Sequence, residues 1–234
     1  MENNLEKMLS NKKIARVAGL WYLLLAITSG FSWMYITKIF VSGNAPLTAH
    51  YIIASETQYL IAIISNIIGQ ISFIFLGLTL YRLLKQVNET QSKLMLAFVL
   101  ISIPIMFITI FFQTGALIII TNADYLKVFS VEQVSAFVMM FLNISIKGVH
   151  IVEIFWGLWL FPLSYLIYKS NFIPKILAIL LIISGISYII SSITSLIFPE
   201  IFMIIEKKLS IPEAFGELAI LFWLLIKGIT ISKK

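Results

Sequence analysis

Long apolar stretches alternate with short polar connections along this chain of 234 residues. A helix needs about 20 apolar residues to cross a lipid bilayer, and six stretches reach that length. We expect transmembrane helices at residues 14–36, 57–84, 94–120, 143–168, 173–198 and 213–231. The connections leave no room for a separate soluble domain. Residues 1–234 are therefore predicted to form one integral membrane domain, an all-α bundle of six transmembrane helices.

Three polar or irregular segments set the expected helix boundaries. Residues 1–13 are polar and are predicted to form a short lead before the first helix. Residues 136–142 extend an apolar region that is too long for one straight crossing, so we expect an interfacial or extended lead-in there. Residues 200–212 are amphipathic and charged, and they are interpreted as the connection before the last helix.

The first apolar stretch follows several basic residues, as the core of a signal peptide does. However, 21 residues from Val17 to Thr37 carry no charge, whereas the apolar core of a signal peptide has about 7–15 residues. No clear A-x-A cleavage site follows. The stretch is therefore predicted to be a retained first helix.

Composition supports a lipid environment. Hydrophobic residues make up 60% of the chain, charged residues only 12%, and the mean hydropathy is +0.99. Soluble domains have about 45–50% apolar and about 25% charged residues. The net charge of +6 comes from basic residues beside the apolar stretches, which indicates contact with anionic lipid head groups rather than nucleic acid. The absence of cysteine excludes thiolate nucleophiles and cysteine-bound metal centres.

The distribution of Lys and Arg predicts the orientation of the helices. Cytoplasmic connections of membrane proteins carry an excess of basic residues. Twelve basic residues fall at the termini and the second and fourth connections, and four fall on the other side. Lys147 lies within or at the edge of the fourth helix. Both termini are therefore expected in the cytoplasm.

A few polar side chains interrupt the apolar stretches. An ionisable residue at the centre of a transmembrane helix costs about 2.5–3.5 kcal/mol, so such residues are commonly functional. In the predicted topology they lie in the outer half of the membrane, near the beginnings of the second, fourth and sixth helices and well along the third. They form the candidate polar pocket: Glu56, Gln113, Lys147, His150, Glu153 and Glu217.

This polar layer allows three interpretations. It is a structural network, a cavity for a substrate, proton or lipid head group, or the centre of a metal-dependent intramembrane hydrolase. His150 and Glu153 are three residues apart on one helix face, and His50 and Glu56 would add further ligands. No HExxH motif, phosphate-binding loop or nucleophile elbow occurs, so no catalytic residue, metal ligand or cofactor is assigned. Four serines at helical spacing, Ser184, Ser187, Ser191 and Ser195, indicate close helix packing.

Several short segments, in this order, give the chain its resemblance to a known family. They are ARVAGLWY at 15–22, ASE at 54–56, LYRLL at 80–84 with VN at 87–88, YKSNFIPK at 168–175, GEL at 216–218 and LIKG at 225–228. Together they resemble a family of bacterial membrane proteins described as domain of unknown function 4386. The resemblance extends from about Lys13 to Ile229. It implies a multi-helix membrane protein and provides no catalytic residues.

The sequence thus favours a multi-pass protein of the bacterial inner or plasma membrane, with membrane lipids as its surroundings. We expect it to bind or transport a small molecule or a lipid head group through an outer-leaflet polar pocket. The alternatives are the intramembrane metal-dependent hydrolase and a structural or accessory subunit without catalysis. Neither a nucleic-acid partner nor a cofactor is expected, and the oligomeric state is left open.

The predicted orientation can be tested with single cysteines, since the chain has none of its own. In intact cells, a membrane-impermeant maleimide should label Asn44→Cys in the first connection and should not label Asn88→Cys in the second. After permeabilisation, both variants should react. The reverse pattern would place the termini outside.

Overall fold

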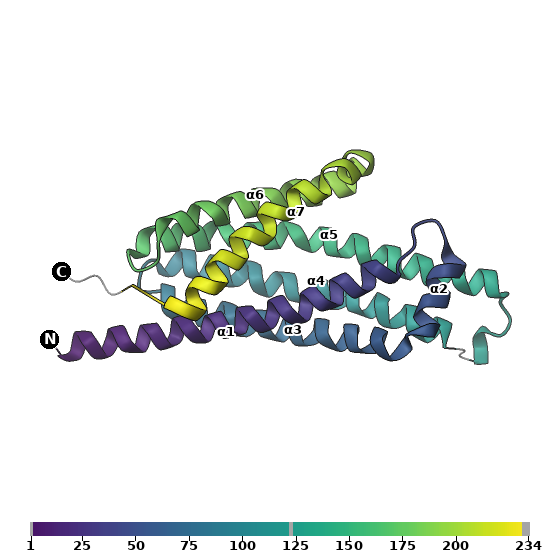
Figure 1. Cartoon of the computed structure of the whole chain (residues 1–234), viewed down its shortest axis with the longest axis horizontal. Helices are drawn as coiled ribbons and strands as arrows, with labels where there is room; N and C mark the ends of the chain where they lie inside the picture. Colours follow the sequence, from purple (N-terminus) through teal and green to yellow (C-terminus); the bar gives the residue numbers. More distant parts are fainter. Residues whose placement is uncertain (1, 122–123, 231–234) are drawn as a thin grey trace. The chain divides into compact units, whose positions relative to one another are not determined.

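The computed structural model describes residues 2–121 and 124–230, and within them helices joined by short connections make up the chain (Figure 1). The described part contains seven α-helices, a 3-10 turn and a terminal π-helical turn, and no strand. In chain order these elements are α1 (Glu2–Ile39), α2 (Ala45–Ala54), α3 (Glu56–Leu84), α4 (Glu89–Ile120), η1 (Asp124–Leu126), α5 (Val131–Ser170), α6 (Lys175–Ile197), α7 (Pro199–Phe222) and η2 (Trp223–Lys227).

Six helical segments of the described chain are long and apolar enough to cross a membrane. They are Leu9–Ile39, Glu56–Leu84, Glu89–Ile120, Val131–Ser170, Lys175–Ile197 and Pro199–Lys227. Helices suit this environment because they satisfy every backbone donor and acceptor internally, without water. The prediction of an all-α fold with six transmembrane helices is confirmed.

The first connection contains a helix that the sequence pattern did not predict. The chain leaves α1 after Ile39 and enters α2 at Ala45, where the Asn44 side chain accepts a hydrogen bond from the Leu47 amide at 3.0 Å. Such an N-cap stabilises the first helical turn, and Pro46 in that turn needs no amide partner. The polar lead before the first predicted helix is also helical, because α1 begins at Glu2.

Two further boundaries were wrong. The predicted lead-in at residues 136–142 belongs to α5, which runs unbroken from Val131 to Ser170. The predicted connection at residues 200–212 belongs to α7, which continues through Pro212. Charged residues favour helix as readily as loop, so the charges in residues 200–212 do not mark a connection. Residues 136–142 were set apart because the apolar region exceeds one crossing, yet a single helix contains all of it. Ile231, the predicted end of the last helix, lies outside the described residues.

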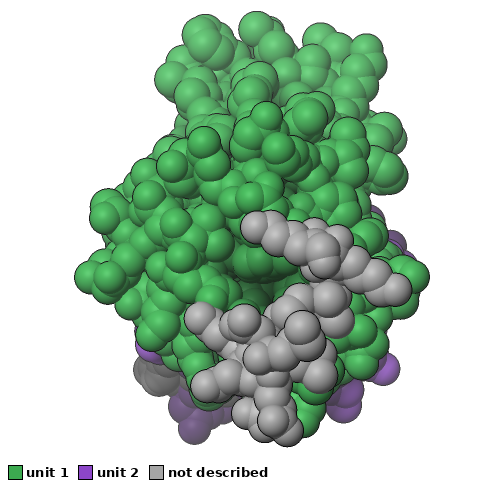
Figure 2. All heavy atoms as spheres, turned by 90° about the vertical axis from the view of Figure 1, so that its left-hand side faces the viewer, with its two compact units in different colours: residues 1–24, 72–103, 150–234 green, residues 25–71, 104–149 purple. Residues whose placement is uncertain are grey.

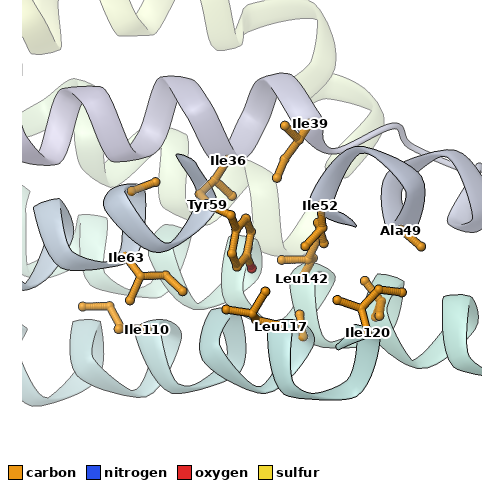
Figure 3. Close-up of a cluster of buried hydrophobic side chains, with 13 residues drawn as sticks. Ile36, Ile39, Ala49, Ile52, Tyr59, Ile63, Ile110, Leu117, Ile120 and Leu142 are labelled. Atoms are coloured by element: carbon orange, nitrogen blue, oxygen red, sulfur yellow. The ribbon is translucent and has the colours of Figure 1, made fainter. Parts of the chain in front are cut away.

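The chain divides into two compact units, coloured separately in Figure 2. Unit 1 comprises Met1–Leu24, Ser72–Ile103 and His150–Lys234, and unit 2 comprises Leu25–Ile71 and Pro104–Val149. Unit 2 has an apolar core in which α2 packs with parts of α1, α3, α4 and α5. Ile36, Ile52, Tyr59, Leu117 and Leu142 lie in this core (Figure 3).

In unit 1, glycines allow α5, α6 and α7 to approach one another closely. A Cβ atom on Gly157 would lie 2.6 Å from the backbone oxygen of Gly185, and a Cβ on Gly185 would lie 2.9 Å from the oxygen of Gly157. A Cβ on Gly216 would lie 2.8 Å from the backbone oxygen of Leu180. Small residues are the usual means of close helix packing in membranes. The helices α6 and α7, joined through Phe198 alone, lie side by side (Figure 1).

The contact between Gly157 and Gly185 can be tested by adding one methyl group. Gly157→Ala should destabilise the protein by about 1–3 kcal/mol, because the methyl group meets a backbone atom that cannot rotate away. The melting temperature of the protein in detergent should fall by about 2–4 °C for each kcal/mol. Gly30→Ala is the matched control, since a Cβ on Gly30 meets no atom within 4 Å. Equal melting temperatures for the two variants would contradict the close packing.

Candidate functional site

Three of the predicted pocket residues lie in unit 2. Glu56 is the first residue of α3 and is exposed, and Lys147 on α5 is also exposed. Gln113 on α4 is buried, and its side-chain amide donates to Ser145 Oγ at 3.0 Å. Its backbone oxygen accepts a hydrogen bond from the Tyr59 hydroxyl at 2.9 Å. Gln113 therefore links α3, α4 and α5 through neutral groups.

The other three, His150, Glu153 and Glu217, lie in unit 1. Glu217 on α7 accepts hydrogen bonds from two tyrosines on two different helices. The Tyr188 hydroxyl of α6 donates to Glu217 Oε1 at 2.6 Å, and the Tyr22 hydroxyl of α1 donates to Glu217 Oε2. Both carboxylate oxygens are thus bound by neutral donors, which hold the carboxylate in a fixed orientation.

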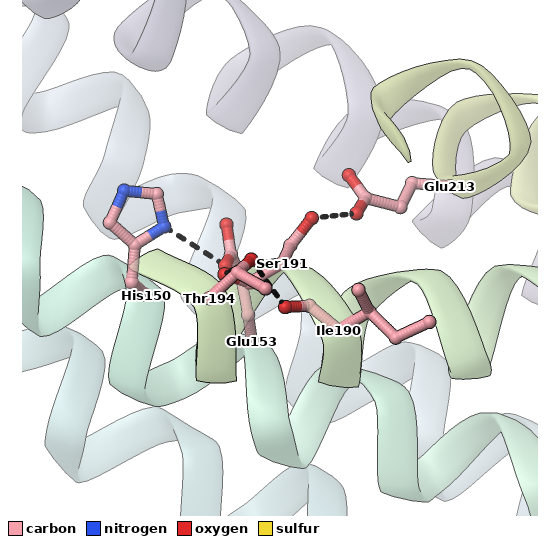
Figure 4. A network of polar contacts seen from close by, with 6 residues as sticks. All are labelled: His150, Glu153, Ile190, Ser191, Thr194 and Glu213. Atoms are coloured by element: carbon pink, nitrogen blue, oxygen red, sulfur yellow. Dashed lines mark hydrogen bonds and ion pairs between the residues drawn. The ribbon is translucent and has the colours of Figure 1, made fainter. Parts of the chain in front are cut away.

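Glu213 lies one helical turn before Glu217, on the same face of α7. It is buried, and its Oε1 accepts a hydrogen bond of 2.6 Å from Ser191 Oγ on α6 (Figure 4). A neighbouring contact strengthens the same pair of helices, because Ser184 Oγ donates to the backbone oxygen of Pro212 at 2.7 Å. Glu213 is therefore held where α6 and α7 meet.

The helix α5 contributes His150 and Glu153 to the site. Both side chains are buried, and His150 Nδ1 and Glu153 Oε2 form a hydrogen bond of 2.9 Å (Figure 4). The His150 ring also packs edge-on against Phe202 of α7, with ring centroids 4.9 Å apart. The spacing of three residues places His150 and Glu153 on one face of α5, and there the two side chains pair with each other.

These groups form one cluster. Glu213 lies within electrostatic range of Glu153, Glu217 and His150. We call Glu153, Glu213 and Glu217, with their partners, the acidic cluster; the partners are His150, Ser191, Tyr22 and Tyr188. Among the described residues, no Lys or Arg forms an ion pair with any of the three carboxylates. Apart from His150, their hydrogen-bond donors are neutral hydroxyl groups.

Aromatic rings surround the cluster. The Tyr188 ring packs against Trp156 with centroids 6.1 Å apart, and the Tyr22 ring packs against Trp159 at 6.2 Å. Trp159 is fully buried and also contacts Phe73 edge-on at 5.2 Å. The two tyrosines that bind Glu217 therefore each pack against a tryptophan of α5.

The geometry offers nothing that favours the metal-dependent hydrolase. Among the side chains that the structure describes, no three from His, Asp or Glu are grouped so that they could hold a metal ion. His50 and Glu56 are both exposed and belong to unit 2. The single layer that would join Glu56 and Gln113 to the acidic cluster stays a prediction.

The sequence pattern missed four residues of the cluster. Glu213 was interpreted as the first residue of the last helix, because residues 200–212 were assigned to a connection. With α7 beginning at Pro199, Glu213 and Glu217 lie near the middle of a span, four residues apart. That spacing was the available signal. The sequence contains no signal that would assign Ser191, Tyr22 and Tyr188 to the cluster, since hydroxyl side chains are common in membrane helices. Glu153 likewise lies in the middle of α5 rather than near its beginning.

Fold and site together define a multi-pass helical membrane protein with a buried acidic cluster. The model of the family described as domain of unknown function 4386 matches residues 17–228. The chain therefore belongs to this family, as the resemblance of its sequence segments implied.

The chain was also compared with individual proteins and with solved structures. A protein of Archaeoglobus fulgidus, described as "Uncharacterized protein", is 36% identical over 80 residues, which are 34% of this chain and 46% of that protein. The chain thus matches less than half the length of this relative. No solved structure matches the chain.

The hydrogen bonds to Glu217 predict a specific effect on stability. Tyr188→Phe removes one donor from a carboxylate that stays in place, which should cost about 1–3 kcal/mol. Tyr165→Phe is the control, because Tyr165 is an exposed tyrosine on α5. Melting temperatures in detergent should fall for Tyr188→Phe and stay unchanged for Tyr165→Phe. When Glu217 is already replaced by Gln, Tyr188→Phe should lower the melting temperature by less than it does in the wild-type protein. If the effects of the two substitutions on stability simply add, the contact between Tyr188 and Glu217 is contradicted.

Proposed function

We propose that this protein binds a small organic cation in the bacterial inner or plasma membrane, and that the acidic cluster is its binding site. The chemical group recognised is a positively charged ammonium, carried by a free amine or by the head group of an amine-containing lipid. The sequence analysis leaves the charge of the small molecule or lipid head group open. The proposal specifies that this charge is positive.

The observation that carries the proposal is the imbalance of charge in the cluster. Three carboxylates are contributed by two helices, and His150 is the sole basic side chain paired with them within the described residues. Charged groups inside a membrane are expensive unless they are paired. Even a protonated His150 balances only one of the three. Each remaining carboxylate is either protonated, and so neutral, or needs a bound cation to balance its charge.

The surrounding rings favour an organic cation over a metal ion. Ammonium groups are attracted to the faces of aromatic rings within about 6 Å, by about 0.5–2 kcal/mol. Tyr22 and Tyr188 bring two such rings to Glu217. Trp159 and Trp156 pack against these two tyrosines. A metal ion would instead require several oxygen or nitrogen ligands converging on one point, and the described residues provide no such group. Anions are repelled by the cluster.

Isothermal titration of purified protein in neutral nanodiscs tests this function. Benzyltrimethylammonium is the soluble probe, and ethanolamine is the small-amine probe. Glu213→Gln and Glu217→Gln preserve size and remove charge, so each should weaken binding of benzyltrimethylammonium at least about tenfold, or by about 1.4 kcal/mol. Glu206→Gln is the matched control, because Glu206 is an exposed carboxylate of the same helix.

A further arm distinguishes a free amine from a lipid. Nanodiscs that contain phosphatidylethanolamine should compete with benzyltrimethylammonium when the ligand is a lipid head group, and should not compete when it is a free amine. Failure of every cation to bind, with Glu213→Gln and Glu217→Gln changing only the melting temperature, would favour the structural or accessory subunit.

A further inference from the structure

Unit 2 contains a pocket that takes no part in the acidic cluster. Its volume is about 380 Å³, and its walls come from α2, the end of α4, η1 with the residues after it, and the beginning of α5. Ala49 and Ile120 belong both to this wall and to the apolar core of unit 2 (Figure 3). Packing of one face of α2 in the core thus fixes the position of the pocket.

Most of the lining is apolar. Ile53 of α2 faces the pocket together with Ile119 of α4, and Leu126, Phe129 and Val134 complete the wall. Ile53 and Phe129 are also exposed, as is Val131 at the start of α5. Apolar side chains that line a pocket and continue onto the surface suit a ligand with an apolar chain.

Two basic side chains lie on the same wall. Both His50 of α2 and Lys127, which follows η1, line the pocket and are exposed. Lys127 forms an ion pair of 2.7 Å with Asp124, but the two side chains are 71% and 90% exposed. An ion pair so open to solvent contributes little stability. Lys127 is therefore available to exchange Asp124 for another anion.

We propose that this pocket binds an anionic amphiphile with a single acyl chain, such as a long-chain fatty acid. The carboxylate lies between Lys127 and His50, and the chain lies against Ile53, Ile119 and Phe129. A carboxylate complements an ammonium group directly and accepts a hydrogen bond from an imidazole. A purely apolar ligand would leave both basic groups without a role.

The location and size of the pocket favour this ligand over a two-chain phospholipid. Ile120 is the last residue of one candidate span and Val131 the first of another, so the pocket lies where two spans end. Amphiphiles concentrate at that level of a membrane, with the charged group toward water. Small-molecule pockets range from about 300 to 1,000 Å³, and this one is near the lower limit, which suits one chain.

Photocrosslinking tests the proposal. Protein in phosphatidylcholine nanodiscs is irradiated with an oleate analogue that carries a diazirine in its chain, and the adducts are located by mass spectrometry. Adducts should concentrate in residues 45–54 and 124–135. Excess unlabelled oleate should suppress them in the wild-type protein, whereas methyl oleate should not, because it lacks the charge.

Two pairs of variants test separately how the pocket binds the acyl chain and how it binds the carboxylate of the ligand. Ile53→Trp fills the pocket and should reduce labelling at least about tenfold; Ile61→Trp is the control, at an exposed isoleucine of α3. Lys127→Glu should reduce labelling by the acid by a similar factor and leave labelling by its methyl ester unchanged. Lys38→Glu is the matched control, because Lys38 is an exposed lysine of unit 2 outside the pocket.

Three results would overturn the proposal. Adducts spread evenly over the exposed helix faces would mean that oleate only dissolves in the surrounding lipid. Equal competition by methyl oleate and oleate would mean that the pocket does not recognise the negative charge of the ligand. Stronger labelling of the same segments by a photoactivatable phosphatidylglycerol would assign the pocket to a two-chain lipid.

Discussion

A carboxylate in an apolar interior must be hydrogen-bonded, and this constraint organises unit 1. The donors for Glu217 come from α1 and α6, the donor for Glu213 comes from α6, and the partner of Glu153 is on α5 itself. The helices must approach closely enough for such short side chains to meet. The glycine contact between α5 and α6, and Gly216 against the backbone of α6, provide that approach. Packing and polar chemistry therefore depend on the same small residues.

Unit 2 is built differently. Its interior polar contacts use neutral groups, such as the amide of Gln113 with the hydroxyl of Ser145, and its core is otherwise apolar. Its basic side chains are exposed, and two of them line a pocket whose other walls are mostly apolar. The two units thus present opposite chemistry, one acidic and enclosed, the other basic and open. The ligands proposed for the two units carry opposite charges, and no residue is shared between the two proposed sites.

The sequence predicts the spans well because hydropathy reports a bulk property of some 20 residues at once. It predicts their ends poorly, since the charged segment 200–212 is as compatible with helix as with a connection, and the apolar segment 136–142 lies in one helix that is longer than a single crossing. The candidate site was likewise predictable only in part. The spacing of His150 and Glu153 was sufficient to place them on one helix face, and the structure adds that they pair with each other. Tyr22 and Tyr188 meet at Glu217 from positions 166 residues apart in the chain, so only the tertiary structure reveals that contact.

Hydrogen bonding and charge balance are separate requirements, and hydrogen bonds from neutral donors meet only the first. Two tyrosine hydroxyls occupy both oxygens of Glu217, yet a neutral donor leaves the net charge of the carboxylate unchanged. A network with a purely structural role gains nothing from that charge, because apolar residues of similar volume commonly replace buried ionic groups without loss of stability. The proposed cation would balance the charge of Glu153, Glu213 and Glu217 in the middle of their helices, which hydrogen bonds from neutral donors cannot do.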